Sequence, residues 1–191
     1  MLPSIILFLQ IFPDDTNEFR DQDNDGLYLI ECIAHIDNSV FMYAKDDGLD
    51  SGGGTEDGEV WVSNTSFESI FHEGAALSGG SSLGKYQHFS SCVFMDCGQG
   101  LELGYSSSAH MVTVDSCRFF RNGIGIRWGD NYTYPHKGFL SVSNSESIEN
   151  RDYDVWNMAK EDWIGKPANM EFSNVWVSKA NLMYPDLKIL E

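Results

Sequence analysis

The sequence predicts an all-β protein that folds as a right-handed parallel β-helix, a solenoid of about six coils. Three observations support this fold class. A short motif recurs at nearly constant spacing, a glycine-led motif follows most of its copies at constant offset, and both motifs alternate apolar and polar positions as strands do. An antiparallel sandwich with chance similarity between its strands is the alternative, but it leaves the joint recurrence of the two motifs unexplained.

The first motif consists of a polar anchor residue with apolar residues at fixed offsets. Its template, residues 36–41, has close copies at 62–67, 89–94 and 114–119 and weaker copies at 142–147 and 172–177. The anchors follow one another at intervals of 26, 27, 25, 28 and 30 residues: Asn38, Asn64, Ser91, Ser116, Asn144 and Asn174. Three positions after the first four anchors stand phenylalanines: Phe41, Phe67, Phe94 and Phe119. Stacked coils would pass hydrogen bonds between the anchors and fill the interior with the phenylalanines.

The second motif is led by glycine and follows the anchor by nine or ten residues. Its copies are Gly48-Leu49, Gly74-Ala75, Gly100-Leu101, Gly125-Ile126 and, in degenerate form, Asp154-Val155. The residue after the glycine should point inward and the next residue outward. Because crossovers between parallel strands are nearly always right-handed, this repeat predicts a right-handed solenoid.

The charge balance limits the possible partners. Twelve Lys and Arg against 29 Asp and Glu give a net charge of −17, which repels phosphate backbones and anionic lipid surfaces. We therefore expect no nucleic-acid partner and no membrane insertion, whereas cations, neutral sugars and metal-bridged anions remain possible. Cys92 and Cys117 hold equivalent positions in neighbouring repeats, so they are either a disulfide or, as we favour, two buried thiols.

The chain is expected to form one domain with short flanking segments. Residues 1–24 are a predicted N-terminal cap or incomplete first coil, residues 25–178 the β-helix, and residues 179–191 a C-terminal tail or cap. The apolar start, residues 2–12, is too short to span a bilayer and lacks the basic region and cleavage site of a signal peptide. We expect it to be the cap or the first strand.

Together the two motifs resemble the repeats of the pectate-lyase-like β-helix superfamily, whose coils show N-x-x-F followed by G-(I/L)-x-(L/I). The resemblance covers roughly residues 25–178. It implies an extracellular or cell-surface protein that acts on oligo- or polysaccharides as a hydrolase or lyase, with a secretion signal not evident in this sequence. The alternative is a non-catalytic glycan-binding or structural solenoid module of a larger surface protein, since the superfamily includes both.

Charged residues occupy equivalent places in successive glycine motifs. The candidate catalytic residues are Asp47, Asp50, His72, Glu73, Glu102 and Arg127. Asp50, Glu102 and Arg127 share the position two after the glycine, so they should line up on one outer face. Asp50 and Glu102 are two coils apart, about 9.6 Å between Cα atoms, which allows the carboxyl spacing of about 6.5–9.5 Å used in inverting glycoside hydrolysis.

The resemblance also implies roles for some of these residues. Asp46-Asp47-Gly48 with His72 is similar to the aspartate cluster and histidine of polygalacturonase-like hydrolases, although the Arg-Ile-Lys motif is missing and Glu73 follows His72 in place of glycine. In the lyases of the superfamily an arginine or lysine acts as the base, for which Arg127 is the candidate. Carboxylates that mark solvated turns, with Arg127 balancing Glu102, are the non-catalytic alternative.

A possible calcium site precedes the first complete repeat. Asp21, Asp23 and Asp25 are spaced as in the first half of an EF-hand loop, but position twelve is Cys32 and the nearest acid is Glu31. Calcium is therefore the one cofactor we consider, and a solvated acidic turn is the alternative.

Overall fold

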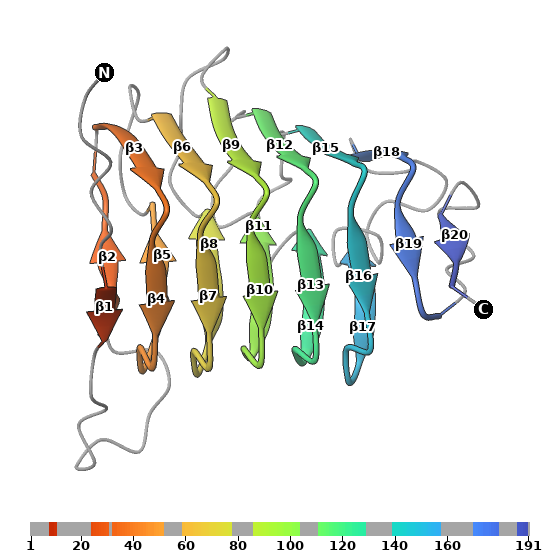
Figure 1. Cartoon of the computed structure of the whole chain (residues 1–191), viewed down its shortest axis with the longest axis horizontal. Coiled ribbons are helices and arrows are strands. Elements are labelled where there is room, and N and C mark those ends of the chain that lie inside the picture. The colour runs from red at the N-terminus through yellow and green to blue at the C-terminus, as the bar shows by residue number, and fades with distance from the viewer. Residues whose placement is uncertain are drawn as a thin grey trace.

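The computed structural model describes residues 8–10, 24–30, 32–51, 59–77, 86–103, 111–128, 139–157, 170–179 and 187–190. Every regular element in these ranges is a strand, and the strands stack into three parallel sheets that wind as a solenoid (Figure 1). The predicted all-β parallel solenoid is confirmed. In the described part of the chain there is no helix long and apolar enough to cross a bilayer.

The three sheets are named A, B and C. Sheet A contains β1 (Phe8–Gln10), β4 (Val40–Met42), β7 (Ser66–Glu68), β10 (Val93–Met95), β13 (Arg118–Phe120), β16 (Glu146–Ile148), β19 (Trp176–Val177) and β20 (Lys188–Ile189). Sheet B contains β2 (Leu27–Tyr28), β5 (Leu49–Asp50), β8 (Glu73–Leu77), β11 (Gln99–Leu103), β14 (Ile124–Trp128) and β17 (Tyr153–Asn157). Sheet C contains β3 (Ile33–Asp37), β6 (Glu59–Ser63), β9 (Tyr86–Ser90), β12 (Met111–Asp115), β15 (Phe139–Ser143) and β18 (Met170–Ser173).

Each coil passes through sheet C, then sheet A, then sheet B. Four consecutive coils, from β6 to β17, have strands of five, three and five residues. The coil before them ends in the two-residue strand β5, and the coil after them has no described strand in sheet B. The expected six coils are thus four regular coils flanked by shorter ones, as is usual where one side of a repeat has no neighbour to pack on.

The predicted phenylalanine stack runs through the interior. Phe41, Phe67, Phe94 and Phe119 pair in register along sheet A and are at most 1% exposed. Their ring centroids lie 4.9, 4.6 and 4.7 Å apart with interplanar angles of 7° or less. These distances match the strand spacing, so the backbone repeat sets the ring repeat.

The glycine motif has a steric cause. A Cβ at Gly74 would lie 2.6 Å from the carbonyl oxygen of Gly100, and a Cβ at Gly100 would lie 2.6 Å from that of Gly125. At this corner each coil therefore approaches the next too closely for any side chain. Glycine recurs because neighbouring backbones touch there.

The anchor residues turn the chain from sheet C to sheet A. Asn38, Asn64 and their equivalents have φ between 48° and 57°. Asparagine tolerates this left-handed conformation better than most residues, which explains the anchor. The expected hydrogen bond between stacked anchors is present where Asn174 Nδ2 donates to Asn144 Oδ1 at 3.0 Å. An interior amide ladder exists elsewhere, where Asn122 Nδ2 donates to Asn150 Oδ1 at 3.1 Å.

The repeat breaks in the coil of β15 to β17. Ser147 replaces the phenylalanine and Asp154 replaces the glycine, and both are buried. Ser147 Oγ donates to the Asp154 carbonyl at 2.6 Å, and Asn150 Nδ2 donates to Asp154 Oδ1 at 2.9 Å. Asp154 Oδ2 also accepts from the Ser178 hydroxyl at 2.7 Å. We call Ser147, Asn150, Asp154 and Ser178 the polar plug, because they close the phenylalanine stack.

The cysteines are thiols in this structure. Cys32, Cys92, Cys97 and Cys117 are all free, and the last three are buried. Cys92 and Cys117 do occupy neighbouring coils as expected, and the Cys92 amide donates to Cys117 Sγ at 3.4 Å.

Candidate active site

The candidate residues lie on the outer face of sheet B, in two columns that cross its strands. The first column holds the residue before each glycine position: Asp47, Glu73, Gln99, Ile124 and Tyr153. The second column holds the residue two after each glycine position: Tyr28, Asp50, Ala76, Glu102, Arg127 and Trp156. The predicted alignment of Asp50, Glu102 and Arg127 on one face is therefore present.

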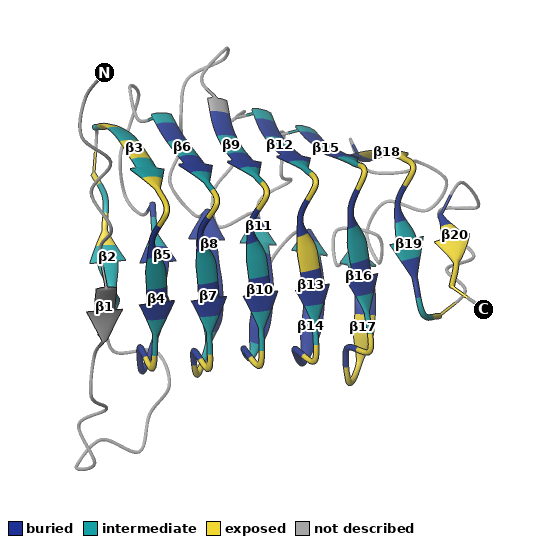
Figure 2. Cartoon of the chain, viewed as in Figure 1, coloured by how far each residue is buried: buried dark blue, intermediate teal, exposed yellow. Residues whose placement is uncertain are grey.

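The middle strands of this face, β8, β11 and β14, are shielded more than the strands of the other sheets. Strands of sheets A and C alternate buried and partly exposed positions, whereas β8 is buried at all five positions (Figure 2). The polar side chains of the first column are among the buried ones, including Asp47, Glu73 and Gln99. Their charge states are consequently set by one another more than by water.

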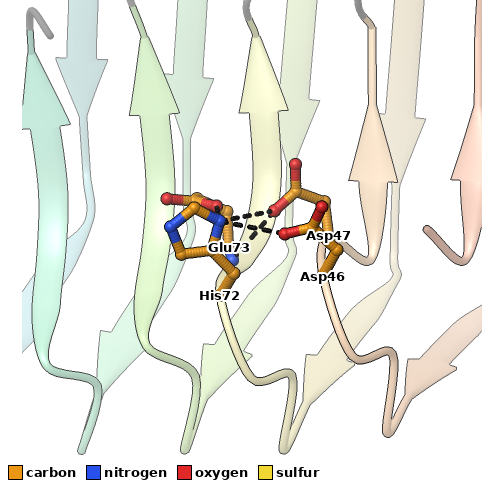
Figure 3. Close-up of side chains that lie close together, drawn as sticks. All are labelled: Asp46, Asp47, His72 and Glu73. Atoms are coloured by element: carbon orange, nitrogen blue, oxygen red, sulfur yellow. Dashed lines mark hydrogen bonds and ion pairs between the residues drawn. The ribbon is translucent and has the colours of Figure 1, made fainter. Parts of the chain in front are cut away.

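Four ionisable side chains converge where the chain enters β5 and β8 (Figure 3). His72 Nδ1 lies 3.0 Å from Asp46 Oδ1 and 3.7 Å from Asp47 Oδ1, and it also contacts Glu73 Oε2. The three carboxyl side chains are at most 10% exposed, while the imidazole is 32% exposed. We call these four residues the acid–histidine cluster; His72 is its member most open to solvent.

The backbone holds the cluster in place from coil to coil. The Asp47 amide donates to Asp25 Oδ1 at 3.2 Å, and the Glu73 amide donates to Asp47 Oδ1 at 3.0 Å. Each acid therefore caps the amide of the equivalent residue in the next coil. The buried position of these carboxyl groups follows from the stacking of the coils.

Burial and proximity change the proton affinities within the cluster. Burial, followed by the hydrogen bond and charge of Glu73, raises the pKa of Asp47 to about 11. Burial also raises the pKa of Glu73 well above its usual value, to which the neighbouring Glu102 adds. Burial alone would lower the pKa of His72, but its hydrogen bond to Asp46 and the charges of Asp47 and Asp46 raise it overall. Near neutral pH Asp47 therefore keeps its proton, and the pKa values of Glu73 and His72 are shifted in the same direction.

The cluster continues along the sheet through Gln99. Gln99 Nε2 donates to Glu73 Oε1 and, at 3.3 Å, to Glu102 Oε2. Arg127 Nη1 donates to Gln99 Oε1 at 3.2 Å and to Glu102 Oε2 at 3.4 Å. One polar network thus joins four successive coils and ends under Trp156, whose ring lies 5.7 Å from the Arg127 guanidinium carbon.

The structure brings together most of the residues that the sequence singled out. Asp47, His72 and Glu73 are in direct contact, and Glu102 and Arg127 join them through Gln99. Asp50 lies in the column of Glu102 with Ala76 between them, so the two acids are two coils apart as expected.

The calcium candidates are placed only in part. Asp25 touches the cluster through the Asp47 amide, whereas Asp21 and Asp23 lie outside the described residues.

Two members of the network were not among the candidate catalytic residues. Asp46 precedes Asp47 and occupies the position equivalent to His72 in the neighbouring coil. That equivalence is the sequence signal for the contact between Asp46 and His72. Gln99 is neutral and so did not stand out as a candidate, yet it occupies the stacked position directly after Glu73 and bridges it to Glu102.

The cluster can hold either protons or a cation. One ligand atom from each of the four residues lies within 4.8 Å of the others. Carboxylate oxygens and an imidazole nitrogen together suit divalent metals such as manganese or zinc, while calcium prefers oxygen alone. Three buried carboxylates cannot all remain ionised unless a positive charge joins them. Binding of a cation and protonation of the carboxyl groups therefore exclude one another.

Comparison with known proteins gives one result. The family described as "Right handed beta helix region" matches residues 15–174. No curated protein and no solved structure matches the chain.

Proposed function

The chain belongs to the right-handed β-helix family, and from this premise we propose that it is an extracellular enzyme that cleaves a polysaccharide on the outer face of sheet B. The observation that carries the proposal is the acid–histidine cluster, in which a partly exposed imidazole is held by buried carboxyl groups beside Glu102 and Arg127. Polar groups with strongly shifted proton affinities are typical of sites that transfer protons.

The proposed reaction uses His72 as general acid and Glu102 as general base. His72 gives its proton to the leaving glycosidic oxygen as the C–O bond breaks. Water adds to the anomeric carbon while Glu102, held by Gln99 and Arg127, takes the proton that water loses. Exchange with solvent then returns both groups to their starting states. Asp50, two coils from Glu102, is the alternative acid.

The charge of the protein favours a neutral substrate. A β-elimination needs a sugar acid, whose carboxylate acidifies the neighbouring C–H bond, and a polymer of such acids would be repelled by a net charge of −17. A lyase reaction on this face would therefore need a bridging cation, whereas hydrolysis of a neutral polysaccharide does not.

The test is activity on a panel of polysaccharides with two readouts. New reducing ends report any cleavage, and ultraviolet absorbance of an unsaturated sugar reports elimination. His72→Ala and Glu102→Gln should each lower reducing-end release by orders of magnitude. Asp50→Asn should do so in place of His72→Ala if Asp50 is the acid. Glu171→Gln removes an exposed acid on sheet C and is the matched control. Full activity of both the His72 and Glu102 variants would refute the site.

A non-catalytic glycan-binding module is the second candidate, and a specific observation favours it. Glu73 is 1% exposed and Asp47 is 7% exposed, so these groups serve folding as well as any chemistry. Binding without product formation on any polysaccharide of the panel would support this second candidate.

A further inference from the structure

We propose that the acid–histidine cluster also serves as a regulatory site that binds a divalent transition-metal ion, with zinc as the best match to its ligands. One carboxyl oxygen from each of three acids and one imidazole nitrogen hold the ion: Asp46, Asp47, Glu73 and His72. Binding itself does not depend on catalysis. Only its consequence, the loss of the proton donor His72, rests on the proposed function and deepens it by naming how the enzyme is regulated.

The four side chains point toward one another (Figure 3), and their donor atoms are spaced as a tetrahedral coordination shell requires. With metal–ligand distances of about 2.0–2.1 Å, the donor atoms of such a shell lie about 3.3–3.4 Å apart. His72 Nδ1 lies 3.0 Å from Asp46 Oδ1 and 3.7 Å from Asp47 Oδ1, on either side of that value. An ion can therefore enter with small adjustments of the side chains.

Two neighbouring coils build the site. Asp46 and Asp47 precede β5 in one coil; in the next, His72 precedes β8 and Glu73 begins that strand. The His72 amide donates to the Asp46 carbonyl at 3.3 Å, and this bond joins the two coils. The turn that enters sheet B is one residue longer in the coils of β5 and β8 than in those of β11 and β14. The longer turn accommodates Asp46 and His72, so the backbone sets their spacing before an ion binds.

His72 selects the kind of ion. Its imidazole nitrogen is a good ligand for zinc, whereas calcium and magnesium prefer oxygen ligands. The ring is 32% exposed while the three carboxyl side chains are at most 10% exposed, so an ion reaches the carboxyl groups past this ring. Its positive charge then matches the buried carboxylates, which are costly to ionise alone.

A bound ion removes the proton donor of the proposed hydrolysis. The ion coordinates Nδ1 of His72, and this nitrogen must first lose its proton to solvent. The ring then retains only its Nε2 proton, and an imidazole with one proton is a far weaker acid than an imidazolium with two. Zinc should therefore inhibit cleavage at the same concentrations at which it binds.

The experiment is isothermal titration calorimetry with zinc chloride near neutral pH and with no polysaccharide present. The parent should bind one zinc ion per chain. His72→Ala removes a ligand and should bind at least about 100-fold more weakly, since loss of a residue that only orients a ligand already costs about 10–100-fold. Glu73→Gln should also weaken binding. His35→Ala is the matched control, because it removes an exposed histidine ring on sheet C, and it should bind like the parent.

Cobalt(II) gives a second readout on the parent that needs no variant. Cobalt held by four protein ligands absorbs visible light strongly, whereas six-coordinate cobalt at adventitious surface sites absorbs weakly. Strong bands that zinc abolishes are the expected result, and weak bands would reject the four-ligand site.

The proposal is overturned if the parent binds no zinc, if His72→Ala and His35→Ala bind zinc equally, or if bound zinc leaves cleavage unchanged. Zinc binding by a parent that cleaves no polysaccharide of the panel would retain the metal site and reject the enzymatic proposal. Cleavage by a parent that binds no zinc would do the reverse.

Discussion

Replacing Asp47 by asparagine should change how stability depends on pH while leaving the fold intact. Asp47 is 7% exposed, and its pKa of about 11 means that it is protonated in the folded protein at neutral pH. An asparagine has the shape of the protonated acid, can accept from the Glu73 amide through Oδ1, and can donate to the Glu73 carboxyl group through Nδ2. It should therefore replace Asp47 with little strain.

The size of the effect follows from the proton that folding takes up. In the unfolded chain Asp47 ionises near its ordinary pKa of 3.8, and in the folded protein near 11. Its contribution to the unfolding free energy is thus complete below about pH 4. As the pH rises from there toward 11, this contribution is lost at about 1.4 kcal/mol per pH unit. Between pH 5 and pH 7 the parent should lose about 2–3 kcal/mol through this group alone. The raised pKa values of Glu73 and His72 act in the same direction.

Urea unfolding at pH 5, 6 and 7 measures this directly. The Asp47→Asn variant should show a shallower decline of the unfolding free energy than the parent, by about 2–3 kcal/mol over the two units. The range stops at pH 5 because exposed acids with lowered pKa values, such as Asp37 and Asp115, oppose the trend when they become protonated in stronger acid. Glu171→Gln should follow the parent. A decline identical in parent and Asp47→Asn, or a collapse of the variant at pH 5, would refute the reasoning.

Two further predictions concern the core and the cation. Phe94→Ala should cost about 3–5 kcal/mol of unfolding free energy because it empties the middle of the ring stack. Phe71→Ala, which removes a half-exposed ring, should cost little. Equal melting temperatures of the two variants would contradict the role of the stack. We also propose that calcium binds Asp21, Asp23 and Asp25, with Asp46 and Asp47 of the neighbouring coil beside them. At 100 times its dissociation constant calcium should add about 2.7 kcal/mol to the unfolding free energy. Identical melting curves in excess calcium and excess chelator would exclude the site.

The fold was predictable because stacking imposes one rule on every coil. The Phe41 to Phe119 spacing and the glycine motif each report a contact between neighbouring coils, so they repeat and can be counted. The left-handed turn at the Asn38 and Asn64 position was not predictable in the same way. Asparagine suits both a stacked amide ladder and a left-handed turn, and spacing alone does not distinguish them.

The candidate site was predictable as a set of columns but not as a set of contacts. Register places Asp50, Glu102 and Arg127 in one line, and this follows from counting residues. The contact of His72 with Asp46 depends on the turn before the glycine, where the chain leaves simple alternation. Burial of Glu73 and the bridge made by Gln99 depend on three-dimensional packing, which no local pattern encodes.

The polar plug has a consequence for how the chain finds its alignment during folding. The four coils that contain Phe41, Phe67, Phe94 and Phe119 could pair one coil out of step and still match phenylalanine with phenylalanine and glycine with glycine. Asp154 and Ser147 have no such duplicates, and a shifted pairing would bury them against apolar neighbours without their hydrogen bonds. The coil that departs from the repeat therefore fixes which coil pairs with which. A sequence that restored phenylalanine and glycine there would remove the penalty that separates the native alignment from its shifted copies.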